Sequence, residues 1–272
     1  MLESKDGGRR SRILGVFPVA LHLRAVAVSG NRIWVGGDTK RGRGLLLDRS
    51  GAQGRWRGVT LPGGVNEVRD VAVIAGDVWV AGRAGRTGIL LKRSGNGWRE
   101  AARVRPPSRG RAVLVSLSVA GSSVVAAGSD GAAGVMVFST RLGERSKTVR
   151  TQRLDSATAV AEAWGEILVT GYRAPGGVVE NAIGRLLRST LQAERFWLRT
   201  FKGTTQLLDV SFRPPKTAYI IATTGRGDVA WRSRTGGKTW TKLLGAQGLT
   251  IERLVDGGSF YAVGGSGLLH IP

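Results

Sequence analysis

Basic side chains set among glycines are the residues of this chain best suited to chemistry. Runs such as residues 41–43 (Arg-Gly-Arg), 83–86 (Arg-Ala-Gly-Arg) and 109–111 (Arg-Gly-Arg) place guanidinium groups on flexible backbone. Arginine can pair with an anion through two parallel hydrogen bonds, and glycine lets the backbone approach the ligand closely. The runs predict an anion-binding surface made of Lys40, Arg41, Arg43, Arg83, Arg86, Arg103, Arg105, Arg109, Arg111, Arg173 and Arg226.

The composition favours the same partners and excludes other chemistry. The 272 residues include 41 Lys and Arg against 19 Asp and Glu, which gives a formal net charge of +22. A surface of this kind attracts polyanions, although an adaptation of the surface to solubility or heat is the alternative. Cysteine is absent and the histidines are His22 and His270. These counts exclude disulfides, thiolate chemistry and a His-based zinc cluster, so we expect no metal and no cofactor.

Carboxylates at turns raise the possibility of a glycosidase, which needs a pair of them. Asp38, Asp130, Asp228 and Glu180 fall at predicted turns, and Tyr172 stands nearby as a candidate nucleophile. Acidic residues beside glycine are, however, ordinary turn formers. The sequence also has no Gly-rich phosphate loop, and both histidines lie in apolar strands, which disfavours Ser-His-Asp chemistry. We therefore expect that the chain is not an enzyme.

The elements that would position these residues recur along the chain. Residues 68–98 contain three short runs rich in Val, Ile, Leu and Trp, bounded by Gly, Asp or Ser, and a fourth run begins at Trp98. This pattern is typical of four strands joined by tight turns. The glycines that end the second strands stand 45, 46 and 43 residues apart. They are Gly37, Gly82, Gly128 and Gly171, and the series continues near Thr223 and at Gly265.

Four-stranded repeats at this spacing predict a β-propeller, here an all-β fold of six antiparallel blades. The first strands are expected at residues 23–28, 68–74, 114–119, 157–163, 207–212 and 251–255. The last repeat has only three strands, and an open edge invites aggregation. We therefore expect the N-terminal strand, residues 12–17, to close the last blade. Residues 1–11 are then a flexible basic tail, and residues 12–272 form a single domain.

One turn resembles the Asp-box of sialidase-type propellers, a Ser-x-Asp-x-Gly-x-Thr-Trp motif. Ser233, Gly237, Thr239 and Trp240 match the motif, while Thr235 stands in the place of the aspartate. The repeats are also similar to those of photosystem II assembly-factor propellers. The resemblance implies a fold rather than an activity, because the box stabilises a turn. Trp34 and Trp79 occupy equivalent places in the repeats, which indicates packing between blades rather than base stacking.

These observations favour a non-enzymatic, cytoplasmic and monomeric propeller whose basic loop face binds a polyanion, such as nucleic acid or a ribonucleoprotein. One alternative is a protein-binding scaffold or assembly factor that docks on an acidic protein surface. A sialidase-like glycosidase is the other alternative. No run of 18 uninterrupted apolar residues occurs, so we expect no transmembrane helix.

Overall fold

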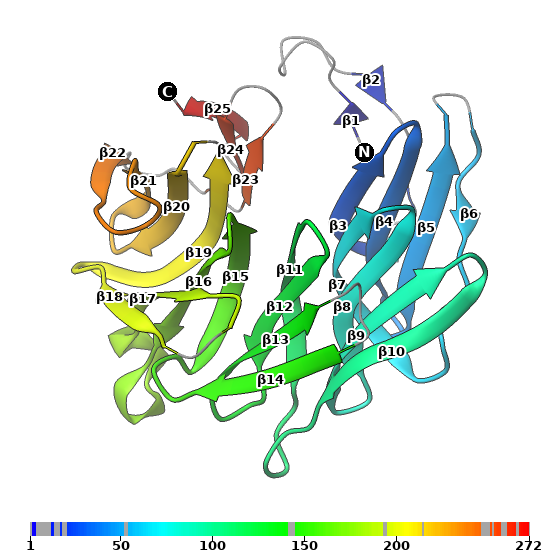
Figure 1. Cartoon of the computed structure of the whole chain (residues 1–272), viewed down its shortest axis with the longest axis horizontal. Helices are drawn as coiled ribbons and strands as arrows, with labels where there is room; N and C mark the ends of the chain where they lie inside the picture. The colour runs from blue at the N-terminus through cyan, green and yellow to red at the C-terminus, as the bar shows by residue number, and fades with distance from the viewer. Residues whose placement is uncertain are drawn as a thin grey trace. The chain divides into compact units, whose positions relative to one another are not determined.

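The computed structural model describes residues 2–3, 12–13, 17, 21–51, 54–140, 145–192, 195–213, 215–245, 251, 253–256, 260–264 and 267–271. The chain divides into two compact units. Unit 1 comprises residues 1–132 and 137–148, and unit 2 comprises residues 133–136 and 149–272. Nearly all regular structure in the described residues is antiparallel β-sheet (Figure 1).

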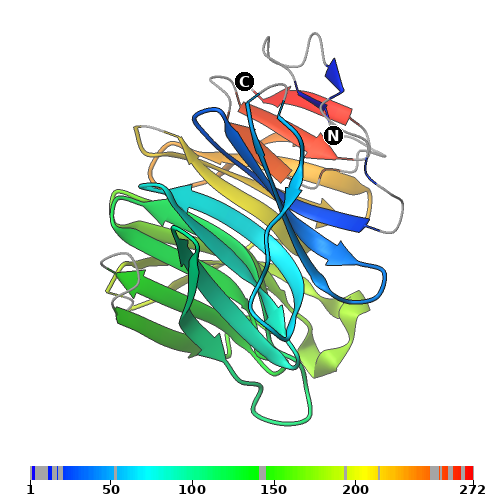
Figure 2. The same ribbon diagram turned by 90° about the vertical axis from the view of Figure 1, so that its right-hand side faces the viewer.

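The first two sheets belong to unit 1, and each follows the chain in order (Figure 2). The first contains β3 (Leu21–Ser29), β4 (Arg32–Thr39), β5 (Gly44–Ser50) and β6 (Arg57–Gly58). The second contains β7 (Val65–Ile74), β8 (Asp77–Ala84), β9 (Thr87–Ser94) and β10 (Gly97–Val104). The third sheet, whose residues fall in both units, contains β11 (Val113–Ala120), β12 (Ser123–Ser129), β13 (Gly134–Thr140) and β14 (Arg145–Thr151).

Unit 2 continues the same pattern. The fourth sheet contains β15 (Ser156–Ala163), β16 (Glu166–Arg173), β17 (Ile183–Thr190) and β18 (Trp197–Thr200). Two short 3-10 turns, η2 (Pro175–Gly177) and η3 (Val179–Asn181), lie between β16 and β17. The fifth sheet contains β19 (Thr204–Arg213), β20 (Thr217–Thr224), β21 (Gly227–Ser233) and β22 (Thr241–Gly245). The sixth has three strands in the described residues: β23 (Arg253–Asp256), β24 (Phe260–Gly264) and β25 (Gly267–Ile271).

The second strand of a blade ends in glycine because the backbone of the first strand lies too close for a side chain there. At Gly82 a Cβ atom would overlap the carbonyl oxygen of Glu67, and at Gly37 it would overlap that of His22. The first strand bulges at this point, with register shifts between Leu23 and Ala25 and between Val68 and Asp70. A β-bulge brings an extra residue into one strand and redirects its side chain. The repeat that the glycines mark is therefore also a repeat of this bulge.

Carboxylates of the first strands join one sheet to the next within each unit. Asp70 accepts the backbone N–H groups of Val71 (2.9 Å) and Leu117 (2.7 Å). Asp209 does the same for Val210 (2.9 Å) and Leu254 (2.8 Å). The apolar faces of neighbouring sheets pack together around these links, for example Trp34 of β4 with Val68 of β7. Trp34 and Trp79 are only 2% and 0% exposed, so both rings are buried, and Trp34 packs between sheets as predicted.

The structure differs from the sequence-based expectation at the N-terminus. Arg12–Ile13 (β2) pairs with Leu2–Glu3 (β1), so the described part of this strand forms a local two-stranded ladder instead of joining β25. Pairing within a short loop requires less chain entropy than pairing with the far end of the chain. The rest of the predicted flexible tail, residue 1 and residues 4–11, lies outside the described residues. The described residues contain no helix long and apolar enough to cross a membrane.

Candidate binding site

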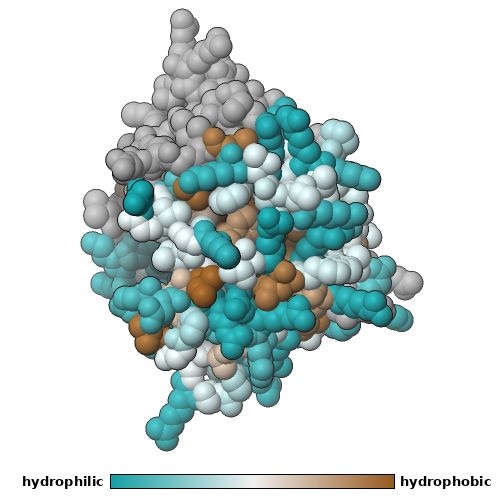
Figure 3. All heavy atoms as spheres, turned by 90° about the vertical axis from the view of Figure 1, so that its left-hand side faces the viewer, coloured by the Kyte–Doolittle hydropathy of each residue, from teal (hydrophilic) through white to brown (hydrophobic). Residues whose placement is uncertain are grey.

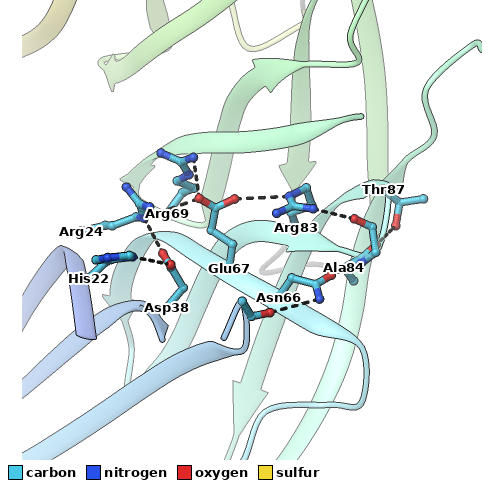
Figure 4. Close-up of polar contacts among 11 residues, drawn as sticks. His22, Arg24, Asp38, Asn66, Glu67, Arg69, Arg83, Ala84 and Thr87 are labelled. Carbon is cyan, nitrogen blue, oxygen red and sulfur yellow. Dashed lines mark hydrogen bonds and ion pairs between the residues drawn. The ribbon is translucent and has the colours of Figure 1, made fainter. Parts of the chain in front are cut away.

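The first two sheets carry a cluster of charged side chains at the edge where β3 and β7 begin and β4 and β8 end. We call this the arginine cluster, and it consists of His22, Arg24, Asp38, Glu67, Arg69 and Arg83 (Figure 4). Arg24 and Arg69 occupy the bulge positions of their strands. Because a bulge redirects a side chain, both guanidinium groups reach the same carboxylate.

Glu67 is the centre of the cluster. Its side chain is only 8% exposed, yet it lies 2.5 Å from Arg69 Nη2, 3.3 Å from Arg83 Nε and 3.5 Å from Arg24 Nε. A buried carboxylate is tolerated when it is paired and hydrogen-bonded. The three arginines outnumber the two carboxylates of the cluster, Glu67 and Asp38, so the cluster is cationic as a whole.

Asp38 is the second carboxylate of the cluster. Arg24 Nε donates to its Oδ1 at 2.6 Å, and His22 Nδ1 lies 3.0 Å from its Oδ2. Burial alone raises the pKa of Asp38, but the hydrogen bonds and positive charge of His22 and Arg24 outweigh burial and lower this pKa below its usual value. Asp38 is therefore ionised at neutral pH, and Arg24 is shared between Asp38 and Glu67.

Hydrogen bonds connect the basic turns of unit 1 around this cluster. Asn66 donates to the carbonyl oxygen of Gly42 (3.3 Å) and accepts the N–H of Gly85, so it ties the turn between β4 and β5 to the turn between β8 and β9. Arg86 donates to the carbonyl oxygens of Ser108 (3.0 Å) and Gly110 (3.0 and 3.1 Å) in the segment before β11. The three segments thus form one connected edge of unit 1.

This edge brings together most of the site residues predicted from the sequence. We call its exposed cations the basic rim, defined as Lys40, Arg41, Arg43, Arg86, Arg109 and Arg111. Arg83 belongs to the arginine cluster, and Arg103 is held by Glu100 and Thr87. Arg105 is exposed in the segment before β11. Arg173 and Arg226 are exposed and belong to unit 2.

Ion pairs account for other cations on the sheets. Lys92 Nζ lies 2.7 Å from Asp77, and Arg188 donates to both oxygens of Glu166 at 2.8 and 2.9 Å. Hydrogen bonds from Lys92 and Ser94 lower the pKa of Asp77. Each pair joins the start of a second strand to the third strand of the same sheet. These cations therefore stabilise the sheets.

Three of the four carboxylates that suggested a glycosidase hold backbone or arginine groups. Asp130 is buried and accepts the N–H of Ala132 at 3.0 Å, and Asp228 accepts the N–H of Ile251 at 2.6 Å. Asp38 is committed to the arginine cluster. Glu180 of η3 and Arg173 at the end of β16 are exposed, and Tyr172 is half-buried. In the described part of the chain, no three His, Asp or Glu side chains lie close enough to hold a metal ion.

Hydroxyl groups hold the turn between β21 and β22. Ser233 Oγ accepts the N–H of Gly237 (2.9 Å), and Thr235 Oγ1 accepts the N–H of Thr239 (2.9 Å). Trp240 donates its indole N–H to the carbonyl oxygen of Gly237 at 2.9 Å. Thr235 thus supplies an acceptor at the position where the motif it resembles has aspartate.

Comparison with known proteins supports the fold. No model of a protein family matches the chain, and no curated protein matches it. A solved structure described as YCF48 bound to D1 peptide matches 98% of this chain and 84% of its own, with a TM-score of 0.68 and 15% sequence identity. At this identity the similarity concerns the fold alone.

The fold is a β-propeller. Its blades are the five four-stranded sheets and the three-stranded sheet of the described residues, in the order of the chain. Blades one and two carry the arginine cluster, of which sequence reasoning found only Arg83 as a binding residue. The two aligned repeats, residues 23–37 and 68–82, do place Arg24 and Arg69 at equivalent positions. This equivalence could have identified Arg24 and Arg69 from the sequence. The structure shows that both lie at the bulge of a first strand.

The side of unit 2 that carries β18 and β22 is shown in Figure 3. Hydrophilic side chains dominate this face, and hydrophobic ones are scattered among them. Trp197 and Leu198 of β18 are exposed to 51% and 40%. The guanidinium carbon of Arg188 lies 5.2 Å from the centre of the Trp197 ring, which shields part of that apolar surface.

Proposed function

We propose that this propeller is a non-catalytic scaffold that binds an acidic segment of a partner protein at the basic rim of unit 1. The proposal rests on one observation above all. The rim cations Lys40, Arg41, Arg43, Arg109 and Arg111 are exposed, and no carboxylate among the described residues pairs with them. Positive charge that the protein does not neutralise itself attracts an acidic partner.

The arginine cluster supports this role by stiffening the base of the rim. Glu67 and Asp38 hold Arg24, Arg69 and Arg83 in fixed positions, while Asn66 fixes the two neighbouring turns. A surface whose side chains and turns are already held loses less conformational entropy when a ligand binds. The rim can therefore present its outer cations on a rigid edge.

A peptide partner is consistent with the structural neighbour, which is described as bound to a D1 peptide. A propeller of similar fold therefore holds a peptide, and this favours a protein partner over nucleic acid. The engaged states of Asp38, Asp130 and Asp228 support the non-catalytic part of the proposal. We place this scaffold in the cytoplasm, as the sequence led us to expect.

Nucleic acid is the second candidate, because the net charge of +22 extends over the whole chain. Exposed Arg173 and Arg226 in unit 2 add basic surface beyond the rim. Binding of this kind would depend steeply on salt, since each neutralised phosphate releases counterions. A compact acidic peptide should show a shallower dependence, because it engages fewer charges.

A binding experiment with the purified, nuclease-treated full chain distinguishes an acidic protein partner from nucleic acid. Fluorescence anisotropy would compare a labelled peptide rich in Glu and Asp with labelled single-stranded RNA and DNA of equal charge, across a salt series. The scaffold proposal expects the peptide to bind more tightly than either nucleic acid at physiological salt. Tighter binding of RNA or DNA, with a slope steeper than about −4 in log–log form, would overturn it in favour of the second candidate.

A further inference from the structure

A pocket of about 580 Å³, open to solvent on one side, lies at blade five within unit 2. Its walls come from the segment that leads into β19, from the turn between β20 and β21, and from β21 and β22. The side chains that matter here are Lys202, Thr204, Thr224, Arg226, Trp231 and Lys242. This volume is in the range of sites for small organic ligands, which is roughly 300–1,000 Å³.

The pocket is strongly cationic. Lys202, Arg226 and Lys242 line it, and none of its lining residues is acidic. Asp228 is the neighbour of Gly227, but its carboxylate is buried and accepts the N–H of Ile251 at 2.6 Å. No ion pair within the described residues joins the three pocket cations to a carboxylate. A ligand with at least two negative charges would therefore meet no competing acid among the lining residues.

The basic turn is held in place by its own hydrogen bonds. Thr224 Oγ1 accepts the N–H of Arg226 at 3.2 Å and donates to the carbonyl oxygen of Gly227 at 2.5 Å. Gly227 has φ = 120°, a conformation that favours glycine. The turn therefore fixes the backbone of Arg226 beside the pocket before any ligand arrives.

An aromatic ring forms another wall. Trp231 lines the pocket and packs edge-on against Phe201, with ring centres 5.2 Å apart and an angle of 75° between the planes. Val229, from the same face of β21, is a second apolar lining residue. The pocket thus combines cations with flat apolar surface, which is the combination that recognises an anion carried on a ring.

We propose that the blade-five pocket binds a small organic phosphate that also carries a flat ring, as a nucleoside monophosphate carries its base on the phosphorylated sugar. A phosphate monoester carries nearly two negative charges at neutral pH and offers three acceptor oxygens. Arginine can pair with two of these oxygens at once, and the two lysines supply further donors. The ring of the ligand would lie against Trp231 and Val229. This site uses none of the residues of the basic rim, so it stands independently of the scaffold function.

Adenosine 5′-monophosphate is a suitable probe, with adenosine and inorganic phosphate as its separate halves. Isothermal titration calorimetry on the full chain should show that the monophosphate binds at least about tenfold more tightly than either half. Arg226→Ala and Lys242→Ala should each weaken binding of the monophosphate by about tenfold, because each removes a charge-assisted contact. Arg234→Ala is the matched control, since Arg234 is exposed on the same blade and does not line the pocket.

Tryptophan fluorescence locates the bound ring. The monophosphate should quench part of the emission of the wild-type chain, and Trp231→Phe should remove that quenching while calorimetry still detects binding. The proposal is overturned by any of three results. These are no heat with millimolar monophosphate, equal weakening by Arg234→Ala and Arg226→Ala, and equal affinities for the monophosphate and inorganic phosphate.

Discussion

Basic side chains gather both in the arginine cluster of blades one and two and in the pocket of blade five. The two sites differ in whether carboxylates of the protein neutralise this charge. In the cluster, Arg24, Arg69 and Arg83 surround the buried carboxylate of Glu67. In the pocket, Lys202, Arg226 and Lys242 line a cavity that no acidic residue lines. The cluster cations are fixed by the protein, whereas the pocket cations remain available to a ligand.

This difference shows that the number of arginines is a poor guide to a binding surface. The presence of a carboxylate partner decides which arginines are held by the protein itself. Arg103, for example, was predicted as a binding residue and is held by Glu100. Lys40, Arg41 and Arg43 have the same basic character and no such partner among the described residues. The predictions that follow change the cluster or its surroundings and ask whether the two kinds of cation respond differently.

The largest effect is expected when the cluster loses its central charge. Glu67→Gln leaves three neighbouring guanidinium groups without their shared carboxylate, and an uncompensated charge of this kind costs about 3 kcal/mol of stability. Urea unfolding measures the loss. Glu100→Gln is the control, because Glu100 and Arg103 are an exposed pair, each with a side chain 39% exposed, and such pairs contribute less than about 1 kcal/mol. Equal losses for the two variants would contradict the central role of Glu67.

The packing behind the cluster should be nearly as sensitive. In Gly82→Ala the new Cβ would overlap the carbonyl oxygen of Glu67, so the β7 backbone must shift and the cluster must shift with it. We expect a loss of about 2 kcal/mol, in the range of overpacked cores, measured by thermal or urea unfolding. At Gly58 a Cβ would meet no atom within 4 Å, so Gly58→Ala should change stability by less than about 0.5 kcal/mol. A tolerated Gly82→Ala would show that the bulge adapts.

The pH dependence of stability tests the pairing at Asp38. Its pKa is lower in the folded chain than in the unfolded chain, so its contribution is present above about pH 4 and is lost as the pH falls through the folded pKa. Asp38→Asn should therefore lower stability at pH 7 by about 2 kcal/mol, the value of hydrogen bonds to a charged group. The difference should shrink in acid. A loss that is independent of pH would mean that shape rather than charge matters.

Glu162 of β15 should show the opposite sign with a smaller effect. Burial raises its pKa, although the N–H of Gly165 partly opposes this. A raised folded pKa means that stability is highest below about pH 4 and declines as the pH rises toward the folded pKa. Glu162→Gln should thus stabilise the protein at neutral pH by about 1 kcal/mol and have no effect in acid. Destabilisation at neutral pH would contradict the assignment of burial as the dominant cause.

Sequence reasoning predicted the blades well because their signals are local. The first strands of blades one to five were placed within a few residues of β3, β7, β11, β15 and β19. Apolar strand runs and turn residues are signals within one repeat, and the glycine spacing relates each repeat to the next one along the chain. The glycines proved to mark bulges where a Cβ has no room, so the repeat had a steric cause that the spacing alone could not reveal.

The arrangement of charge could not be predicted in the same way. Whether Arg24 reaches Glu67 depends on a bulge and on contacts between residues 43 positions apart. Asn66 joins turns that precede and follow it in the chain, and no local pattern signals such a link. The pairing of Arg12–Ile13 with Leu2–Glu3 was missed for a different reason. Because the last repeat has only three predicted strands, we expected residues 12–17 to pair with it. Residues 12–13 pair instead with Leu2–Glu3, which are much closer in the chain.

The central claim is that unpaired rim cations, and not basic charge in general, bind an acidic partner. The most direct test compares two triple variants of equal charge in the anisotropy experiment with the acidic peptide. One is Lys40→Ala, Arg41→Ala and Arg43→Ala on the rim, and the other is Arg55→Ala, Arg57→Ala and Arg99→Ala on exposed positions beside and within the outer strands β6 and β10. We predict that the rim variant weakens binding at least about tenfold, while the other changes it less than about threefold. Equal weakening by both would contradict the claim and show that only net charge matters.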